Sequence, residues 1–225
     1  MTFHRAVPAY IWHGDDGRWA ALLERVQRGD LVIVTGPESG PPRMPLDVVG
    51  VRRRIGQLRE CAAVIVGYVA LGYGARPYGA VMADVGEWRP LGVDGAWFDE
   101  APASITTDVL RSLRGWHGQV RSWRPHISTG RLKGVSAWNP GTWHPSINDA
   151  MRALPDSIWC TVECAHEDYA ARARVRRSTW PLREVHLVHA CPAGTVTATE
   201  SEIRRNVGWG YATTDGPDGN PWDGG

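Results

Sequence analysis

Short apolar runs alternate with longer amphipathic segments along the whole 225-residue chain. Each apolar run is nearly continuous, which is typical of strands buried on both faces of a parallel sheet. The amphipathic segments repeat apolar residues at helical spacing, as Trp19, Leu22, Leu23 and Val26 do in the first of them. The eight predicted strands are Ala6–Trp12, Leu31–Gly36, Ala62–Val69, Val93–Phe98, Gly134–Trp138, Ser157–Glu163, Glu184–Ala190 and Val207–Thr213. The predicted helices are Gly17–Arg28, Asp47–Cys61, Pro77–Arg89, Thr106–Trp123, His144–Leu154, His166–Arg177 and Glu200–Asn206.

Eight strands with helices between them predict an α/β protein, a single (β/α)8 TIM-type barrel over residues 1–225. A doubly wound open sheet is the main alternative, and it usually carries a glycine-rich phosphate loop after its first strand. The turn after the first predicted strand instead reads His-Gly-Asp-Asp-Gly, with neither GxGxxG nor a P-loop. From about residue 215 the chain is rich in Gly and Pro, which predicts a tail or closing loop after the last strand.

The overall composition is that of an ordinary globular domain, with 43% hydrophobic and 22% charged residues. The net charge of +1 gives no bias toward nucleic acid or an anionic membrane, and no apolar run reaches the roughly 18 residues of a membrane span. The first residues lack the apolar stretch of a secretory signal, so the chain as encoded is expected to stay inside the cell or to leave by another route. We expect a monomer without nucleic-acid or membrane partners.

The tryptophans, the single lysine and the cysteines each bear on the chemistry. Twelve tryptophans against two phenylalanines provide many flat aromatic faces, which serve either core filling or sugar binding. Lys133 is the single lysine, and its polar surroundings make it a poor Schiff-base nucleophile. Cys160 and Cys164 lie four residues apart in one predicted strand and are expected to face the same side. No cysteine or histidine set has metal-ligand spacing, so no metal and no organic cofactor is expected.

Acidic side chains close two of the predicted strands. Asp99 and Glu100 follow the fourth strand, and Glu163 ends the sixth. Because barrel active sites lie at the carboxyl ends of the strands, these acids are expected at one mouth. Two carboxylates in such a place suit glycoside hydrolysis, in which one protonates the leaving oxygen and the other attacks the anomeric carbon or activates water.

Other interpretations of these residues stay open. Asp99 and Glu100 are also consistent with capping of the next helix. Glu163 is harder to explain in that way, because a carboxylate after the apolar run Ile-Trp-Cys-Thr-Val is costly without a partner or a purpose. A Cys/His pair such as Cys191 with His189 is a weaker candidate for catalysis, and the chain has no HExxH and no GxSxG motif.

Several short motifs occur in the order known from one family. They are Val-Pro-Ala-Tyr-Ile-Trp near the start, Ser39-Gly40-Pro41, Gly67-Tyr68-Val69 with Tyr73-Gly74-x-Arg76, Asp94-Gly95-Ala96-Trp97-Phe98-Asp99-Glu100, Asn139-Pro140-Gly141-Thr142, Glu163, Gly210-Tyr211 and Asn220-Pro221-Trp222-Asp223. In these motifs the chain resembles the spherulation-specific family 4 (spherulin-4-like) proteins over nearly its whole length. After the second strand it departs from the family, with Thr-Gly-Pro-Glu-Ser-Gly-Pro-Pro in place of an Asn-Pro-x-Ser-Gly-Pro-Gly run.

The resemblance implies a (β/α)8 barrel and an endo-acting glycoside hydrolase for a microbial amino-sugar polysaccharide, of the type with α-1,4-linked N-acetylgalactosamine. It implies that Asp99 and Glu163 are the catalytic pair, Glu163 as the acid and Asp99 as the nucleophile or its equivalent, with Glu100 beside them. Tyr68, Tyr73 and Asn139 fall where the family's substrate-lining residues fall.

Aromatic residues at the mouth are further predicted to be sugar-stacking platforms, namely Trp12, Tyr68, Tyr73 and Trp138. Arg76, just beyond the third strand, is predicted as an additional substrate contact. The alternative function is a catalytically inactive barrel that binds glycans or belongs to a larger assembly. The presence of all three acids favours an enzyme, because a binding protein has no need of a paired acid.

Overall fold

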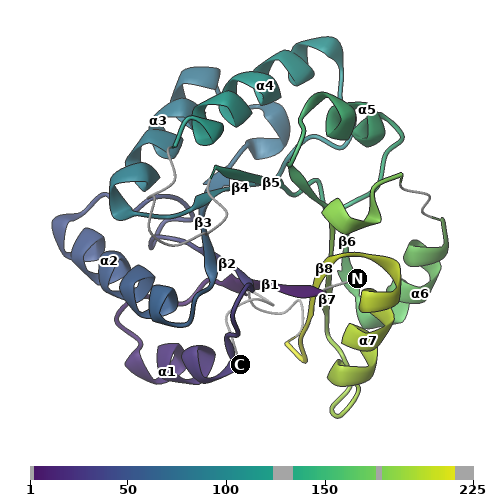
Figure 1. Ribbon diagram of the computed structural model, residues 1–225, viewed down its shortest axis with the longest axis horizontal. Helices are drawn as coiled ribbons and strands as arrows, with labels where there is room; N and C mark the ends of the chain where they lie inside the picture. The colour runs from purple at the N-terminus through teal and green to yellow at the C-terminus, as the bar shows by residue number, and fades with distance from the viewer. Residues whose placement is uncertain (1–2, 124–133, 176–178, 216–225) are drawn as a thin grey trace.

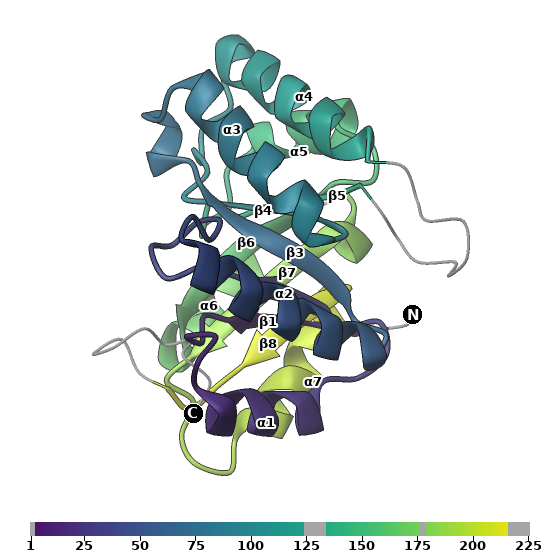
Figure 2. The same cartoon turned by 90° about the vertical axis from the view of Figure 1, so that its left-hand side faces the viewer.

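Eight parallel strands close into a barrel in the computed structural model, which describes residues 3–123, 134–175 and 179–215. Each strand pairs with the next along the chain, and β8 returns to β1. Figure 1 shows the helices as an outer ring around the strands, and Figure 2 shows α3 and α4 side by side on that ring. The predicted (β/α)8 architecture is confirmed, and the open-sheet alternative is wrong.

The strands are β1 (His4–Ala9), β2 (Leu31–Val34), β3 (Val64–Ala70), β4 (Gly95–Asp99), β5 (Val135–Trp138), β6 (Ile158–Ala165), β7 (Glu184–His189) and β8 (Trp209–Ala212). The α-helices are α1 (Asp16–Arg25), α2 (Pro45–Glu60), α3 (Tyr78–Trp88), α4 (Thr107–Arg121), α5 (Ser146–Ala153), α6 (His166–Val175) and α7 (Val196–Asn206). Short 3-10 turns cover Gly72–Gly74, Arg89–Leu91 and Pro181–Arg183.

The predicted boundaries differ from the structure at two places that matter. Helix α7 begins four residues earlier than predicted, at Val196 after Thr195. Strand β6 continues two residues past its predicted end, so Glu163 lies inside the strand and not at its last position. The predicted tail after about residue 215 lies outside the described residues, as does Lys133.

A register shift in β6 separates the two cysteines that were expected to share a face. The pairing of β6 with β7 is irregular between Cys160 and Val162. Such a bulge adds a residue to one strand and reverses the alternation of side chains beyond it. Cys160 therefore packs in the main core, whereas Cys164 packs in a separate cluster with Tyr169 and Ile203.

An aromatic stack fills the layer between the strands and the helices. Phe98 stacks on Trp116 of α4 and on Trp138, the latter at a ring separation of 4.2 Å. Trp138 stacks in turn on Trp159. Since strand side chains alternate, Phe98 and Trp138 face the helices, and the residues that follow them, Asp99 and Asn139, face the barrel mouth.

Two of the other buried acids lie at the opposite ends of the strands, where they hold the backbone. Asp30 accepts from the Gln27 N–H and forms an ion pair with Arg5. Asp94, with no exposed surface, accepts from the Ile65 N–H at 3.0 Å. These contacts explain their burial without a catalytic role. In the described part of the chain, no helix combines the length and the apolar character that crossing a membrane requires.

Candidate active site

One amide group joins the two acids that the sequence singled out. The side-chain nitrogen of Asn139 donates to Asp99 Oδ1 at 2.6 Å and to Glu163 Oε2 at 2.7 Å. The three residues come from β4, the end of β5 and β6. The two bound oxygens are therefore closer together than the sum of these distances. The two carboxylates are thus close enough to act on one glycosidic bond.

The Asn139 amide is fixed in its orientation by the loop that follows β5. Its oxygen accepts from the Gly141 N–H at 2.9 Å, so its nitrogen must face the acids. Gly141 also accepts the Glu163 N–H at 3.0 Å and has a positive φ of 65°. Glycine adopts this conformation without the steric cost that other residues meet.

The surroundings of Asp99 have two opposite effects on the pKa of its carboxyl group. Burial and the negative charge of Glu163 raise its pKa from 3.8 to about 6, against the effect of hydrogen bonds from Tyr68, the Glu100 N–H and Asn139. Three donors on one carboxyl group favour its ionised form, and Asp99 is ionised above about pH 6.

Two tyrosines beside Asp99 remain protonated. Burial first, then the charge of Asp99, raises the pKa of Tyr68 and of Tyr10. Their rings meet edge to face with centroids 5.4 Å apart. Tyr68 is almost fully buried and donates a hydrogen bond to Asp99, and the part of it that stays accessible lines the cavity beside Asp99.

A cavity of about 510 Å³ opens beside Asp99. Its walls come from the ends of the first four strands and include Tyr10, Trp12, Ser39 and Tyr68. Trp12 is 63% exposed, as a stacking platform requires. It lies over Gly14, where a β-carbon would be 2.5 Å from the indole ring.

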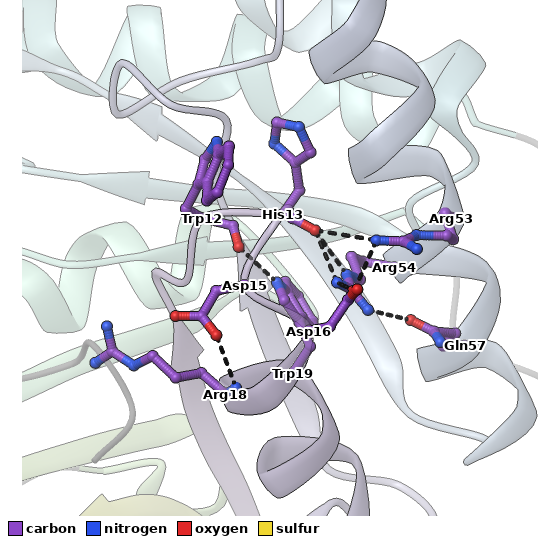
Figure 3. Close-up of polar contacts among 9 residues, drawn as sticks. All are labelled: Trp12, His13, Asp15, Asp16, Arg18, Trp19, Arg53, Arg54 and Gln57. Atoms are coloured by element: carbon purple, nitrogen blue, oxygen red, sulfur yellow. Dashed lines mark hydrogen bonds and ion pairs between the residues drawn. The ribbon is translucent and has the colours of Figure 1, made fainter.

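The backbone beside Trp12 is held by contacts from two helices (Figure 3). Trp19 of α1 donates its indole N–H to the Trp12 carbonyl at 3.1 Å. The guanidinium of Arg54, on α2, donates to the His13 carbonyl at 2.9 and 2.8 Å and pairs with Asp16. These contacts fix the loop before any ligand arrives, which lowers the conformational cost of binding.

Tyr73 and Glu100 form a second fixed element at the mouth. The Glu100 carboxylate accepts from the Gly72 N–H at 3.2 Å, and the Glu100 carbonyl accepts from the Tyr73 N–H at 2.7 Å. Both Tyr73 and Glu100 have positive φ, near 54° and 52°, although neither is glycine. Such strain persists only where surrounding contacts hold it. Tyr73 is held with 72% of its surface exposed.

Two predicted substrate contacts are engaged elsewhere. Trp138 is fully buried in the aromatic stack and presents no face to a ligand. Arg76 donates to the Ala70 carbonyl at 2.6 Å and pairs with Asp84 of α3 at 2.9 Å. The sequence indicates both because they lie at or beyond predicted strand ends, but the strand register turns Trp138 toward the helices, and the contact with Asp84 holds Arg76.

Two residues of the site were not predicted individually. Tyr10 lies against Tyr68 in the cavity, and Gly141 fixes the Asn139 amide. Both belong to motifs that carried the resemblance, and the motif positions were the available signal. Among the residues that the structure describes, no group of three or more His, Cys, Asp or Glu side chains is arranged to hold a metal ion.

Comparison with known proteins bears on the family and the fold. The model of spherulation-specific family 4 matches residues 6–224. The chain belongs to this family. Spherulin-4 of Physarum polycephalum is 29% identical over 124 residues, a match that covers 52% of this chain and 36% of that protein. The crystal structure of Aspergillus clavatus Sph3 in complex with GalNAc superimposes with a TM-score of 0.79 at 19% identity, covering 98% of this chain and 95% of that one. This spherulation-specific family 4 chain therefore shares its barrel fold with Sph3.

Proposed function

We propose that this protein is an endo-acting glycoside hydrolase that uses Asp99 and Glu163 as its catalytic pair. The observation that carries the proposal is the Asp99–Asn139–Glu163 arrangement at the barrel mouth. In this mechanism the coupled pair shares one proton. Asp99, held by three donors, attacks the anomeric carbon in its ionised form, while Glu163 gives the shared proton to the leaving oxygen. Water, deprotonated by Glu163, then displaces Asp99 from the sugar and restores both groups.

The substrate we propose is a microbial polysaccharide that contains α-1,4-linked N-acetylgalactosamine. Family membership and the GalNAc bound to the Sph3 barrel support this choice. The exposed rings of Trp12 and Tyr73 support a polymer substrate, because sugar rings stack on flat aromatic faces.

The direct test is the release of reducing ends from a panel of microbial polysaccharides, with an α-1,4-linked N-acetylgalactosamine polymer among them. We expect release from that polymer and short oligosaccharides as products. Tight binding without any release would instead support the inactive glycan-binding barrel.

The pH dependence of kcat/KM tests the coupling of the two acids. The reaction needs one ionised and one protonated carboxyl group, and the pair loses its last proton near the raised pKa of about 6, so kcat/KM should fall above about pH 6. Tyr68→Phe removes a hydrogen bond that lowers the pKa of Asp99, so we expect this alkaline limb at higher pH than in the parent. An alkaline limb that does not move would contradict the role given to Tyr68.

Glu100 was grouped with the catalytic acids, and its contacts point to a positioning role. Glu100→Ala removes the acceptor for the Gly72 N–H and should loosen the turn that carries Tyr73, raising KM about 3–10-fold. Glu100→Gln keeps an acceptor oxygen, so its KM and kcat should stay close to those of the parent. A large fall of kcat in Glu100→Gln would show that the Glu100 charge takes part in the chemistry.

A further inference from the structure

The hydroxyl group of Tyr10 has no hydrogen-bond partner among the residues that the structure describes. Tyr10 directly follows β1 and lines the cavity that contains Asp99. Its half-buried ring is held edge to face against Tyr68. Polar groups that are withdrawn from solvent are nearly always hydrogen bonded, so an unpartnered hydroxyl in a cavity wall indicates contact with a ligand.

The charges that act on this hydroxyl show that Tyr10 reaches toward the centre of the mouth. After the larger effect of burial, the charges of Asp99 on β4 and of Glu163 on β6 both raise the pKa of Tyr10. In the closed ring these strands lie on either side of β1 at equal distance, one beyond β2 and β3 and the other beyond β8 and β7. A side chain from β1 that is close to both acids must therefore extend across the mouth toward the acid pair.

Tyr10 presents a neutral hydrogen-bond donor at this place. Burial and two negative charges oppose its ionisation, so the phenol keeps its proton at every pH at which the acids act. The Asp99 carboxylate does not use this donor, because its hydrogen bonds come from Tyr68, the Glu100 N–H and Asn139. The two neighbouring tyrosines thus differ in what they bind: Tyr68 donates to Asp99, and the hydroxyl of Tyr10 is left for an oxygen of the substrate.

We propose that Tyr10 is a substrate-binding residue whose hydroxyl group donates a hydrogen bond to an oxygen of the sugar unit that Asp99 attacks. The inference rests on the proposed function, in which that sugar unit occupies the cavity beside Asp99. Every substrate presents this one sugar to the acid pair, whatever group follows on the leaving side. Loss of the donor should therefore weaken the cleavage of long and short substrates by the same factor.

Tyr10→Phe tests this proposal, because it removes the hydroxyl and keeps the ring that packs on Tyr68. We expect kcat/KM to fall about 3–10-fold, the effect of one lost hydrogen bond, on the α-1,4-linked N-acetylgalactosamine polymer and equally on an aryl α-N-acetylgalactosaminide. The dissociation constant of N-acetylgalactosamine, measured by calorimetry, should rise by a similar factor. Tyr78→Phe is the matched control and should change none of these values, since Tyr78 is an exposed residue at the start of α3 and does not line this cavity. Urea unfolding checks that both variants fold.

The pH profile separates the role of Tyr10 from that of Tyr68. Tyr68→Phe is expected to move the alkaline limb of kcat/KM, whereas Tyr10→Phe should leave it in place, because Tyr10 is not hydrogen bonded to Asp99. A limb that moves in Tyr10→Phe would show that Tyr10 acts through the ionisation of Asp99, and would overturn this inference. Unchanged kinetics and sugar binding in Tyr10→Phe would overturn it too, and both results leave the proposed function intact. If the parent cleaves neither substrate while Tyr10→Phe still binds N-acetylgalactosamine more weakly, the proposed function is wrong and the sugar contact of Tyr10 stands.

Discussion

Asp99→Asn and Glu163→Gln are each expected to lower kcat on the polymer at least about 100-fold. Asparagine removes the attacking oxygen charge, and glutamine cannot donate an acidic proton, while both keep nearly the volume of the native side chain. Glu167→Gln is the matched control, since Glu167 is an exposed carboxylate on the first turn of α6. Initial rates of reducing-end release measure the effect.

The same Asp99→Asn variant should unfold less readily than the parent at pH 8. The folded-state pKa of Asp99 is raised above its unfolded value, so the native state binds more protons between about pH 4 and 6. Stability therefore falls as the pH rises through this window, and the full penalty is present above it. Removing the charge should raise the free energy of unfolding by on the order of 1–3 kcal/mol, which urea unfolding can measure.

These two readouts separate a catalytic role from a structural one. Substitution of a structural residue lowers both the activity and the stability of the protein. Substitution of a catalytic residue lowers the activity while the stability stays the same or rises. Near-normal turnover in both Asp99→Asn and Glu163→Gln would refute the assignment of the pair.

Gly95→Ala is expected to destabilise the barrel by about 3 kcal/mol or more, or to prevent folding. Gly95 begins β4 and pairs with Val66 on one side and Val135 on the other. A β-carbon there would lie 1.9 Å from the Val135 carbonyl oxygen, which belongs to the backbone and cannot rotate away. This clash can be relieved only if β5 moves away from β4. Asn139 directly follows β5, so it would move as well.

Gly56→Ala provides the comparison, because a β-carbon at this position in α2 would meet nothing within 4 Å. Replacing glycine by alanine in an exposed helix interior is expected to raise the free energy of unfolding by about 0.5–1 kcal/mol. Chemical denaturation of both variants measures the difference. A Gly95→Ala protein as stable as the parent would contradict the close approach of β4 and β5.

The barrel was predictable because its signals are local. Each strand is a short apolar run and most helices show helical spacing, so the eight repeats are visible without tertiary information. The bulge in β6 is not visible in that way. It depends on how β6 pairs with β7, and it places Cys160 and Cys164 in different clusters.

The candidate site was predictable as a set of strand ends, but not as a set of contacts. Asp99, Glu163 and Asn139 meet because three separate strands close into one ring. The contact of Glu100 with Gly72 spans 28 residues, and no local pattern announces it. Trp138 was misplaced because its face depends on the strand register, which the sequence alone left undetermined.

The hydrogen bond from Gly141 to Asn139 has a consequence for how this site can diverge during evolution. The N–H of residue 141 fixes which end of the Asn139 amide faces the acids. Because this residue has a positive φ, a single replacement of the glycine would disturb that hydrogen bond. A relative with a β-branched residue at this position would have to rebuild the loop, with the amide free to turn. The distance between its two carboxylates would then change, and this distance determines whether hydrolysis retains or inverts the anomeric configuration. Drift in one loop residue, far from either acid in the sequence, is thus a route by which one barrel could give rise to enzymes of opposite stereochemical outcome.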